Sequence, residues 1–509
     1  MIERFIERAK DSHIINLVAG IIFCFLSLGR FNILISIYIW PFCFLNYLHS
    51  TDIKVKSLLI VSSCLLFANM MKWIGHSLDS IGVDFIFGAY FSIINIIPFI
   101  IDNIFYKKIS EWRSIFVFPL SVAFCEYLFG LFPFANFNVY AYAHRENTQY
   151  LQIISLFGTY FLSFIIALFS SILDYSLTLR NNEKIISKFI YVYSIIILII
   201  YFFGFIRLLI PLEKGSYNIA CSLGISPILY DFNDGEELLL PVDNYTDYIN
   251  DKLILAKNSN SSIMIFGEEA FAIFGEDDRE DMINKTKELA KEYNMFIVLP
   301  IDFALTEEKF RNEAVLISNK GEVLYEYQKQ NLIPLMEEGY YEDMGKPKVI
   351  DTEIGKLTIA ICYDIDFPYF INSLSRKHFD ILLVPSWDWE GITEFHSNNA
   401  KYRAIEGGFN IVKSTVNGIS LSFDPKGRVL SYHIERDYRD FFLVATVNKK
   451  GIKTFYSYIG FLFNYLYIIA LICILIPSSI FKKFGSKETR TPSYEMQKLN
   501  ELSESNENV

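Results

Sequence analysis

The sequence has few charged residues for its length and no excess of basic ones. Only 20% of its 509 residues are Asp, Glu, Lys or Arg, and the formal net charge is −11. Proteins that bind nucleic acid carry a basic surface, so we expect no nucleic-acid partner. Hydrophobic residues make up 52% of the chain and aromatic residues 17%, which excludes a disordered or low-complexity protein. So large an apolar share also argues against a wholly soluble protein.

Cysteine is scarce as well. Seven cysteines spread over 509 residues do not make a disulfide framework. In an apolar run, a thiol is usually a small buried hydrophobe, and five of the seven lie in such runs: Cys24, Cys43, Cys64, Cys125 and Cys473. Cys221 and Cys362 lie outside these runs and need another explanation.

Long apolar runs divide the chain into a membrane part and a polar part. A helix of about 20 apolar residues crosses the hydrocarbon core of a bilayer. Runs near this length lie at 14–29, 31–48, 57–74, 83–101, 114–134, 151–173, 189–210 and 459–480. No small-residue cleavage site follows the first run, so we expect a retained span and not a signal peptide.

These runs predict four regions along the chain. We expect a membrane bundle of about seven spans over 1–212 and an inserted domain of mixed composition over 213–454. A last transmembrane helix over 455–480 and a polar tail over 481–509 follow. With a cytoplasmic N-terminus, sixteen Lys and Arg lie in the inner segments, against few in the opposite loops. The positive-inside rule then places the inserted domain on the outer face of the membrane and the tail in the cytoplasm.

The inserted domain alternates short β-branched runs with segments of helical spacing. Buried strands are predicted at Tyr217–Ile225, Ser262–Phe266, Met295–Pro300, Leu357–Ile361 and Ile381–Pro385. Helices are predicted at Tyr245–Asn258, Asp281–Tyr293 and Phe367–Lys377, and a hairpin at 314–318 with 323–327. This alternation indicates an α/β layered domain.

Three reactive residue types follow predicted strands in this domain. Cys362 lies at a strand-to-helix turn, where a nucleophile is commonly exposed and a helix N-terminus lowers the pKa of a thiol. Glu268 and Glu269 follow the strand Ser262–Phe266, and Lys329 follows the hairpin. A carboxylate near a thiol can act as a general base, and an ammonium can stabilise an oxyanion. Taken singly, each has an ordinary explanation in core packing, helix capping or solvation.

Three short sequence strings, which occur in this order, favour a functional explanation over these ordinary ones. They are Phe266-Gly267-Glu268-Glu269-Ala270, 327–334 (Tyr-Gln-Lys-Gln-Asn-Leu-Ile-Pro) and Ile361-Cys362-Tyr363-Asp364. Together they resemble the nitrilase, or carbon–nitrogen hydrolase, superfamily, which carries a Glu–Lys–Cys triad on an αββα sandwich. With the membrane bundle, the chain is similar to the apolipoprotein N-acyltransferase family. The resemblance implies a multi-span α-helical membrane bundle of about eight spans plus an α/β nitrilase-like αββα sandwich domain.

Further strings extend the resemblance over nearly the whole chain. Glu337 lies where the family has another essential acid, and Asn417-Gly418 is similar to the family's strand entry. His396 and 403–406 resemble the helix after the family's Asp-Trp segment, here Asp388-Trp389. The segments 132–142, 151–164 and 456–460 resemble membrane-side segments of the family. The chain departs from the family where Phe266-Gly267 replaces Trp-Pro and Asp364 replaces Glu, which leaves substrate preference open.

The resemblance implies an enzyme of lipoprotein maturation in the bacterial cytoplasmic, or inner, membrane. Glu268, Lys329 and Cys362 would be catalytic, with Glu337, Tyr363 and Asp364 supporting them. Cys362 would take a fatty acyl group from a phospholipid as a thioester. It would then pass that group to the α-amine of a lipoprotein's N-terminal diacylglyceryl-cysteine. This chemistry needs no metal and no other cofactor.

Other classes of function remain open on the sequence. A membrane-anchored amidase would use the same triad to pass the acyl group to water, and an idle binding or scaffold protein would tolerate Cys362→Ala. Charged residues in the bundle also raise the possibility of a transporter. However, His144 and Arg145 fall in a loop, which leaves Glu126 nearly alone and favours a structural or headgroup role for it.

Overall fold

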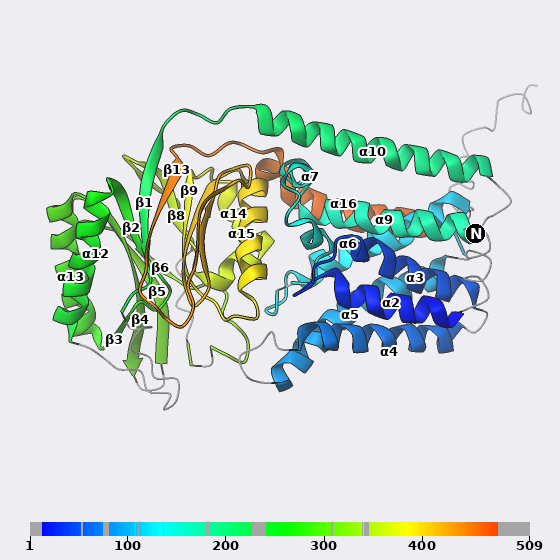
Figure 1. Ribbon diagram of the computed structural model, residues 1–509, viewed down its shortest axis with the longest axis horizontal. Helices are drawn as coiled ribbons and strands as arrows, with labels where there is room; N and C mark the ends of the chain where they lie inside the picture. Colours follow the sequence, from blue (N-terminus) through cyan, green and yellow to red (C-terminus); the bar gives the residue numbers. More distant parts are fainter. Residues whose placement is uncertain are drawn as a thin grey trace, which may run out of the picture.

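A helical bundle and an α/β domain lie side by side in the computed structural model (Figure 1). The structure describes residues 13–51, 54–74, 81–106, 108–109, 111–135, 137–178, 183–225, 241–306, 309–337, 339–340 and 346–476. The predicted tail 481–509 and the last four residues of the predicted run 459–480 lie outside these ranges.

Each of the eight predicted apolar runs contains a helix. The bundle consists of α2 (His13–Ser27), α3 (Ser36–Ser50), α4 (Lys54–Trp73), α5 (Ile81–Phe105), α6 (Val117–Phe129), α9 (Thr159–Thr178), α10 (Glu183–Leu209) and α16 (Phe455–Leu475). Within the described chain, five helical stretches are long and apolar enough to cross a bilayer: 55–73, 84–105, 112–129, 159–177 and 187–209. The stretches 14–27 and 462–475 are apolar but shorter.

The sixth apolar run begins its long helix later than predicted. Two single-turn helices, α7 (Thr148–Leu151) and α8 (Ile154–Phe157), precede α9. Gly158 separates α8 from α9 with a φ of 80°, a conformation that glycine adopts without strain. A Cβ at position 158 would lie 2.3 Å from the ring of Tyr456 in α16, so the packing of α16 against this turn also requires glycine here.

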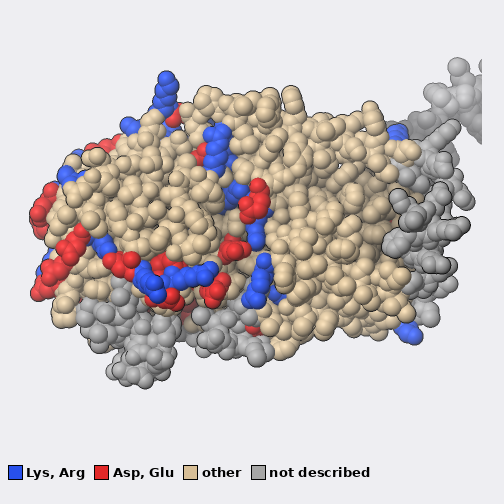
Figure 2. Space-filling view, viewed as in Figure 1, with Lys and Arg blue, Asp and Glu red and all other residues tan. Residues whose placement is uncertain are grey.

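The surface of the bundle differs from that of the α/β domain. In the view of Figure 2, charged side chains gather on the α/β domain and along its boundary with the bundle, whereas the bundle surface is almost free of them. On α10, Leu198 and Phe202 are 68% and 67% exposed. Apolar surface of this extent is expected to face lipid. The helices therefore agree with the predicted membrane bundle.

The α/β domain contains two sheets packed face to face. The first has the order β13-β1-β2-β4-β5-β6, with β3 paired to β4, and the second has the order β12-β11-β10-β9-β8-β7. The strands of the first sheet are β1 (Ser216–Ser222), β2 (Ser261–Phe266), β3 (Phe271–Phe274), β4 (Phe296–Thr306), β5 (Lys309–Ile317), β6 (Val323–Gln328) and β13 (Phe442–Asn448). Those of the second are β7 (Ile350–Thr352), β8 (Gly355–Ile359), β9 (Ile381–Trp387), β10 (Asn410–Val416), β11 (Ile419–Phe423) and β12 (Val429–Ile434).

Helices cover the outer face of each sheet and complete an αββα sandwich. α12 (Val242–Asn258) and α13 (Glu276–Tyr293) cover the first sheet, and α14 (Pro368–Ser375) and α15 (Thr393–Gly407) lie between the second sheet and the bundle (Figure 1). The five predicted strands and the three predicted helices are present, and β5 and β6 pair as the predicted hairpin. Most limits agree within three residues, but β4 continues six residues past Pro300 and α13 begins five residues before Asp281. The predicted fold class is confirmed.

Buried polar contacts join the sandwich to the bundle. Glu406 of α15 accepts hydrogen bonds from the backbone N–H and the hydroxyl of Thr159, at 2.7 and 2.6 Å. The hydroxyl of Tyr402 donates to the carbonyl of Ala141 at 2.9 Å. Within the bundle, Glu126 is buried and accepts a hydrogen bond from the N–H of Tyr140 at 2.8 Å, a structural contact. These contacts hold the second sheet in a defined orientation above the bundle.

Candidate active site

Cys362 lies at a sharp turn between β8 and the short 3-10 helix η3 (Cys362–Asp366). Its φ of 45° is in the left-handed region, which residues other than glycine seldom adopt. Such strain persists only where the surroundings hold it, and it is typical of functional positions. The thiol donates to the carbonyl of Trp387 at 3.3 Å, and the residue is 2% exposed. The strand-to-helix turn predicted for this residue is present.

Glu268 follows β2 and is bound on both carboxylate oxygens. Its Oε1 accepts from Nζ of Lys329 at 2.8 Å and from the amide of Asn312 at 2.7 Å. Its Oε2 accepts from the backbone N–H of Trp387 at 2.7 Å. Trp387 thus contacts the carboxylate through its N–H and the Cys362 thiol through its carbonyl, which brings the acid and the thiol to the same strand end.

Lys329 lies between two carboxylates. Its Nζ donates to Glu268 and also to Oε1 of Glu337 at 2.5 Å, while Oε2 of Glu337 accepts from the N–H of Ile333 at 2.6 Å. Burial alone would lower the pKa of Lys329, but the charges of Glu268 and Glu337 outweigh it and raise that pKa well above its ordinary value. Lys329 is therefore a permanent cation in this site.

One cavity of about 360 Å³ contains the whole predicted triad. Glu268, Lys329, Cys362 and Glu337 line it together with several aromatic side chains. Three residues that are 61 and 33 positions apart in sequence therefore converge at one edge of the sandwich, as the strand ends predict. A carboxylate, an ammonium and a thiol in one cavity can carry out acyl transfer through a covalent intermediate.

The electrostatic state of Cys362 differs from the sequence expectation. A helix N-terminus was expected to lower its pKa, but burial and then the negative charge of Glu268 raise the pKa well above its ordinary value. The thiol is followed directly by a 3-10 helix of only five residues. The dipole of so short a helix is too small to offset the effect of burial on the pKa of the thiol. The resting thiol is protonated and needs a base to become a nucleophile.

Asp364 and Tyr363 support the turn that carries the thiol. Oδ2 of Asp364 accepts from the Ile361 N–H at 2.9 Å and from the hydroxyl of Tyr327 at 2.5 Å, and Oδ1 accepts from the Asn331 N–H at 2.9 Å. Burial raises the pKa of Asp364 to about 6. The hydroxyl of Tyr363 donates to the Pro133 carbonyl at 3.0 Å, which ties the turn to a loop of the bundle.

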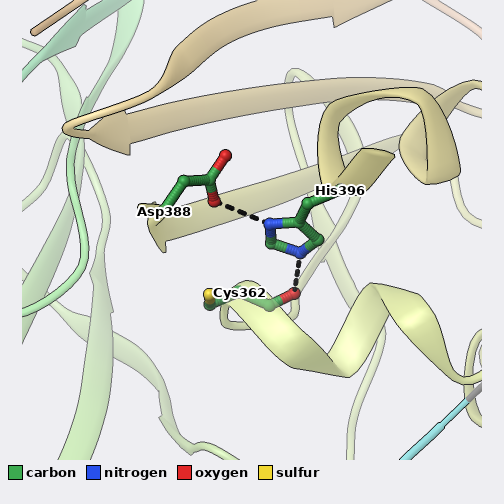
Figure 3. A group of neighbouring side chains, drawn as sticks. All are labelled: Cys362, Asp388 and His396. Carbon is green, nitrogen blue, oxygen red and sulfur yellow. Dashed lines mark hydrogen bonds and ion pairs between the residues drawn. The ribbon is translucent and has the colours of Figure 1, made fainter. Parts of the chain in front are cut away.

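A buried Asp–His pair lies behind the nucleophile, and the site prediction did not include it. Nδ1 of His396 lies 2.6 Å from Asp388, and Nε2 lies 3.1 Å from the carbonyl oxygen of Cys362 (Figure 3). Lys413 donates to the other Asp388 oxygen at 2.7 Å. Figure 3 shows that the imidazole contacts the backbone of Cys362 and not its sulfur. His396 therefore holds the turn and is not placed as the base of the thiol.

Two groups in the described chain have residue types that bind metals. The possible ligand atoms of Cys362, Asp388 and His396 lie within 4.8 Å of one another, as do those of Glu268, Glu269 and Glu337. In the first group, both imidazole nitrogens already have protein partners. In the second, the Lys329 ammonium lies between Glu268 and Glu337, where a metal cation would otherwise bind.

Comparisons with known proteins relate two parts of the chain to known families. Residues 248–448 match the carbon–nitrogen hydrolase family, and residues 19–172 match the apolipoprotein N-acyltransferase N-terminal domain. The apolipoprotein N-acyltransferase 2 of Treponema denticola is 24% identical over 62% of this chain and 66% of its own length. Deaminated glutathione amidase of Dictyostelium discoideum is 29% identical over 30% of this chain and 61% of its own.

The chain thus spans less than two thirds of the length of both of these relatives. Among solved structures, an amidase from Nesterenkonia sp. superposes on 47% of this chain and 93% of its own. The sequence identity is 18% and the TM-score 0.40.

Proposed function

Because the chain belongs to the apolipoprotein N-acyltransferase family of the carbon–nitrogen hydrolase superfamily, we propose that it transfers a fatty acyl group from a phospholipid to a lipoprotein. The acceptor is the α-amine of an N-terminal diacylglyceryl-cysteine. The observation that carries the proposal is the cavity in which Glu268, Lys329 and Cys362 meet, which adjoins an apolar cleft lined in part by bundle residues.

The first half-reaction loads the enzyme. Glu268 takes the proton of Cys362, and the thiolate attacks the ester carbonyl of the phospholipid. Lys329 and a backbone N–H near Cys362 stabilise the negative charge on the carbonyl oxygen. The C–O bond then breaks, Glu268 returns the proton to the departing oxygen, and a lysophospholipid leaves. The product is an acyl thioester on Cys362.

The second half-reaction transfers the acyl group. The neutral α-amine attacks the thioester carbonyl, and Glu268 takes a proton from the nitrogen. The C–S bond breaks and the proton passes to the Cys362 sulfur, which restores the resting thiol. Glu337 positions Lys329 through their 2.5 Å contact, and Asp364 and Tyr363 hold the turn. The residues of this chain supply every proton transfer in the scheme.

An apolar cleft at the junction offers a route for the acyl chain. It is lined on the bundle side by aromatic residues that include Trp73, Phe91 and Phe137. Ile333 and Trp389 line both this cleft and the catalytic cavity, so the two adjoin each other. An acyl chain that enters from the hydrocarbon region would bring its ester toward Cys362. This arrangement supports a lipid substrate over a small soluble amide.

The proposed location is the bacterial cytoplasmic, or inner, membrane, with the catalytic domain on its outer face. The uneven distribution of Lys and Arg between alternate loops supports this orientation. Both substrates are lipids of the outer leaflet, so a domain anchored at that surface meets them without leaving the membrane.

Mass spectrometry of the protein in phospholipid micelles, wild type against Cys362→Ala, tests the proposal. We expect a fatty-acyl mass on the Cys362 peptide, absent from the variant and discharged by a diacylglyceryl lipopeptide. If only water or ammonia discharges the adduct, the protein is a membrane-anchored amidase. If no adduct forms in the wild type, the proposed nucleophile is wrong.

A further inference from the structure

The imidazole of His396 connects a buried carboxylate to the backbone of the proposed nucleophile. His396 lies in the first turn of α15, is 1% exposed, and is not among the residues that line the catalytic cavity or the apolar cleft. Its Nδ1 lies 2.6 Å from Asp388 and its Nε2 lies 3.1 Å from the carbonyl oxygen of Cys362 (Figure 3). The proposed reaction gives His396 no step, so this link needs a reason of its own.

Both nitrogens of the His396 imidazole carry a proton. A carbonyl oxygen only accepts, so Nε2 donates to Cys362. Asp388 accepts from the Lys413 ammonium at 2.7 Å on its other oxygen, so it is an ionised carboxylate to which Nδ1 donates. Burial would lower the pKa of His396, but the charges of Asp366 and Asp388 outweigh it and raise that pKa. His396 is therefore a buried cation with an acceptor on each side.

The contact from His396 fixes the peptide unit between Cys362 and Tyr363. This peptide bond is trans, so the carbonyl of Cys362 and the N–H of Tyr363 point in opposite directions. Figure 3 shows the sulfur of Cys362 on the side of the residue away from its carbonyl oxygen. The N–H of Tyr363 therefore points to the side of the turn on which the sulfur lies.

The backbone N–H of Tyr363 is a buried donor that lacks an acceptor within the described chain. Tyr363 is 5% exposed and its hydroxyl donates to Pro133, but its N–H makes no hydrogen bond to any described residue. The next N–H, that of Asp364, donates to the carbonyl of Ile361 at 3.0 Å. Buried backbone N–H groups are almost always paired, and an unpaired one beside a nucleophile matches what a developing oxyanion requires.

The turn at Cys362 needs a contact that holds this peptide unit. Its φ of 45° is a conformation that residues other than glycine seldom adopt, and it persists only where the surroundings hold it. If nothing held the carbonyl of Cys362, the peptide unit could rotate and turn the N–H of Tyr363 away from the sulfur. A charged donor holds a carbonyl more firmly than a neutral one, and His396 is such a donor.

We infer that His396 is a positioning residue, which holds the carbonyl of Cys362 and thereby aims the N–H of Tyr363 at the carbonyl oxygen of the bound ester. His396 touches neither the substrate nor the reacting sulfur and acts through this one peptide unit. The inference rests on the part of the proposed function in which Cys362 becomes an acyl thioester. It does not depend on which ester supplies the acyl group.

Acylation by an activated ester tests the inference apart from the natural donor. The probe is para-nitrophenyl octanoate with ¹³C at its carbonyl carbon. The C–S bond to Cys362 forms, the C–O bond breaks, para-nitrophenolate leaves, and the thiol proton passes through Glu268 to solvent. The release of para-nitrophenolate gives the loading rate constant and the half-saturating ester concentration, after subtraction of the signal from Cys362→Ala.

His396→Asn should load slowly while it binds the ester normally. Loss of a whole oxyanion donor costs about 10²–10³-fold, so a donor that is misaimed but present should cost about 10–100-fold in the loading rate constant. The half-saturating concentration should stay within about twofold, because ester binding is lost only when a cavity contact is lost. His378→Asn, at a half-buried histidine that is not among the residues lining either cavity, is the matched control and should equal the wild type.

His396→Gln should restore part of the loading rate. A Gln amide reaches the position of Nε2 and can donate to the carbonyl of Cys362, whereas an Asn amide reaches only the position of Nδ1. One recovered hydrogen bond should make His396→Gln at least about fivefold faster than His396→Asn. If His396→Asn does not fold in thermal melting, His396→Leu takes its place, because leucine has a similar volume and neither N–H donor.

The infrared band of the ¹³C-labelled thioester carbonyl separates positioning from a purely structural role. A hydrogen bond from the N–H of Tyr363 lowers the stretching frequency of this carbonyl. The band of the wild type should therefore lie below that of His396→Asn, and the band of His378→Asn should coincide with that of the wild type. Partial unfolding would reduce the amount of acyl-enzyme without moving the band.

Three results would overturn the inference. They are wild-type loading by His396→Asn, equal loading by the Asn and Gln variants, and a slower rate with no movement of the infrared band. If the activated ester acylates Cys362 and phospholipid does not, the proposed function fails while His396 is still judged by these readouts. If neither ester acylates Cys362, the nucleophile is wrong and the inference fails with it.

Discussion

Lys329 and Glu268 form an ion pair of 2.8 Å in which both side chains are almost completely buried, at 1% and 3% exposure. Removing two charges from water is costly, and the pair persists because each ion has further partners. Lys329 also contacts Glu337, and Glu268 also accepts from Asn312 and the Trp387 backbone. The catalytic cavity is therefore built around this pair, and its removal affects both stability and chemistry.

Lys329→Met should be inactive and less stable. It leaves Glu268 and Glu337 facing each other without a cation, and breaking a buried pair in this way costs about 3–5 kcal/mol. Thermal melting should show a lower transition temperature, and no acyl mass should appear on Cys362. Lys291→Met, at a 47% exposed side chain, is the control and should match the wild type. If Lys329→Met forms acyl-Cys362 as fast as the wild type, the lysine has no role in the proposed mechanism.

Glu268→Gln should fold and bind lipid but load slowly. Gln keeps the size of the side chain but takes no proton, and general-base catalysis contributes about 10²–10⁴-fold. We expect the rate of acyl-Cys362 formation to fall by about that factor, measured by quenched samples in the mass spectrometer. Glu353→Gln, at an exposed turn, serves as control. An unchanged loading rate would show that another group deprotonates the thiol.

The resting thiol should react slowly with an alkylating reagent at neutral pH. Burial raises the pKa of Cys362, so the thiolate fraction is small below that pKa and grows as the pH rises. Iodoacetamide labelling of the Cys362 peptide should therefore accelerate continuously from pH 7 to pH 10. The exposed Cys473 is replaced by serine so that its own alkylation does not consume reagent or add to the signal. Fast labelling that is already constant below pH 7 would mean a stable thiolate.

Lys413→Met should weaken the support behind the nucleophile. Burial would raise the pKa of Asp388, but the charges of Lys413 and His396 outweigh it and hold that pKa below its ordinary value. A depressed carboxylate pKa contributes stability above pH 4 that is lost as the pH falls further. The variant should melt at a lower temperature at pH 7, and the difference from the wild type should shrink in acid. An equal difference at every pH would contradict this linkage.

Single-cysteine labelling should settle the orientation of the catalytic domain. Glu288→Cys places a thiol on α13, and Lys56→Cys places one on an inner segment of the predicted topology. A membrane-impermeant maleimide applied to spheroplasts should label position 288 and not position 56 before lysis. The opposite pattern would invert the proposed topology, and with it the leaflet that supplies the substrates.

Several parts of the fold were predictable because their signals are local. Apolar runs of about 20 residues predict spanning helices, and short β-branched runs predict the buried strands β1, β2, β4, β8 and β9. The strand ends and the three strings also identified Glu268, Lys329 and Cys362, which one cavity brings together. Their catalytic roles stay a prediction until they are tested.

Other features depend on residues that are distant in sequence. Lys413 lies in the middle of β10, where a lysine argues against a buried strand, and the strand is fully buried because Asp388 accepts from that ammonium. Asp302 and Tyr340 resemble ordinary polar residues until β4 and the segment after β6 bring them beside Glu269.

The sequence by itself determined the helices, most strands and the order of the triad, since each depends on neighbours within a few positions. Tertiary structure decided the protonation of Cys362, the support from Asp388 and His396, and the contacts of Tyr340 with Glu269 and Asp302. These properties depend on burial and on charges brought within a few ångströms, and only the folded chain sets either one.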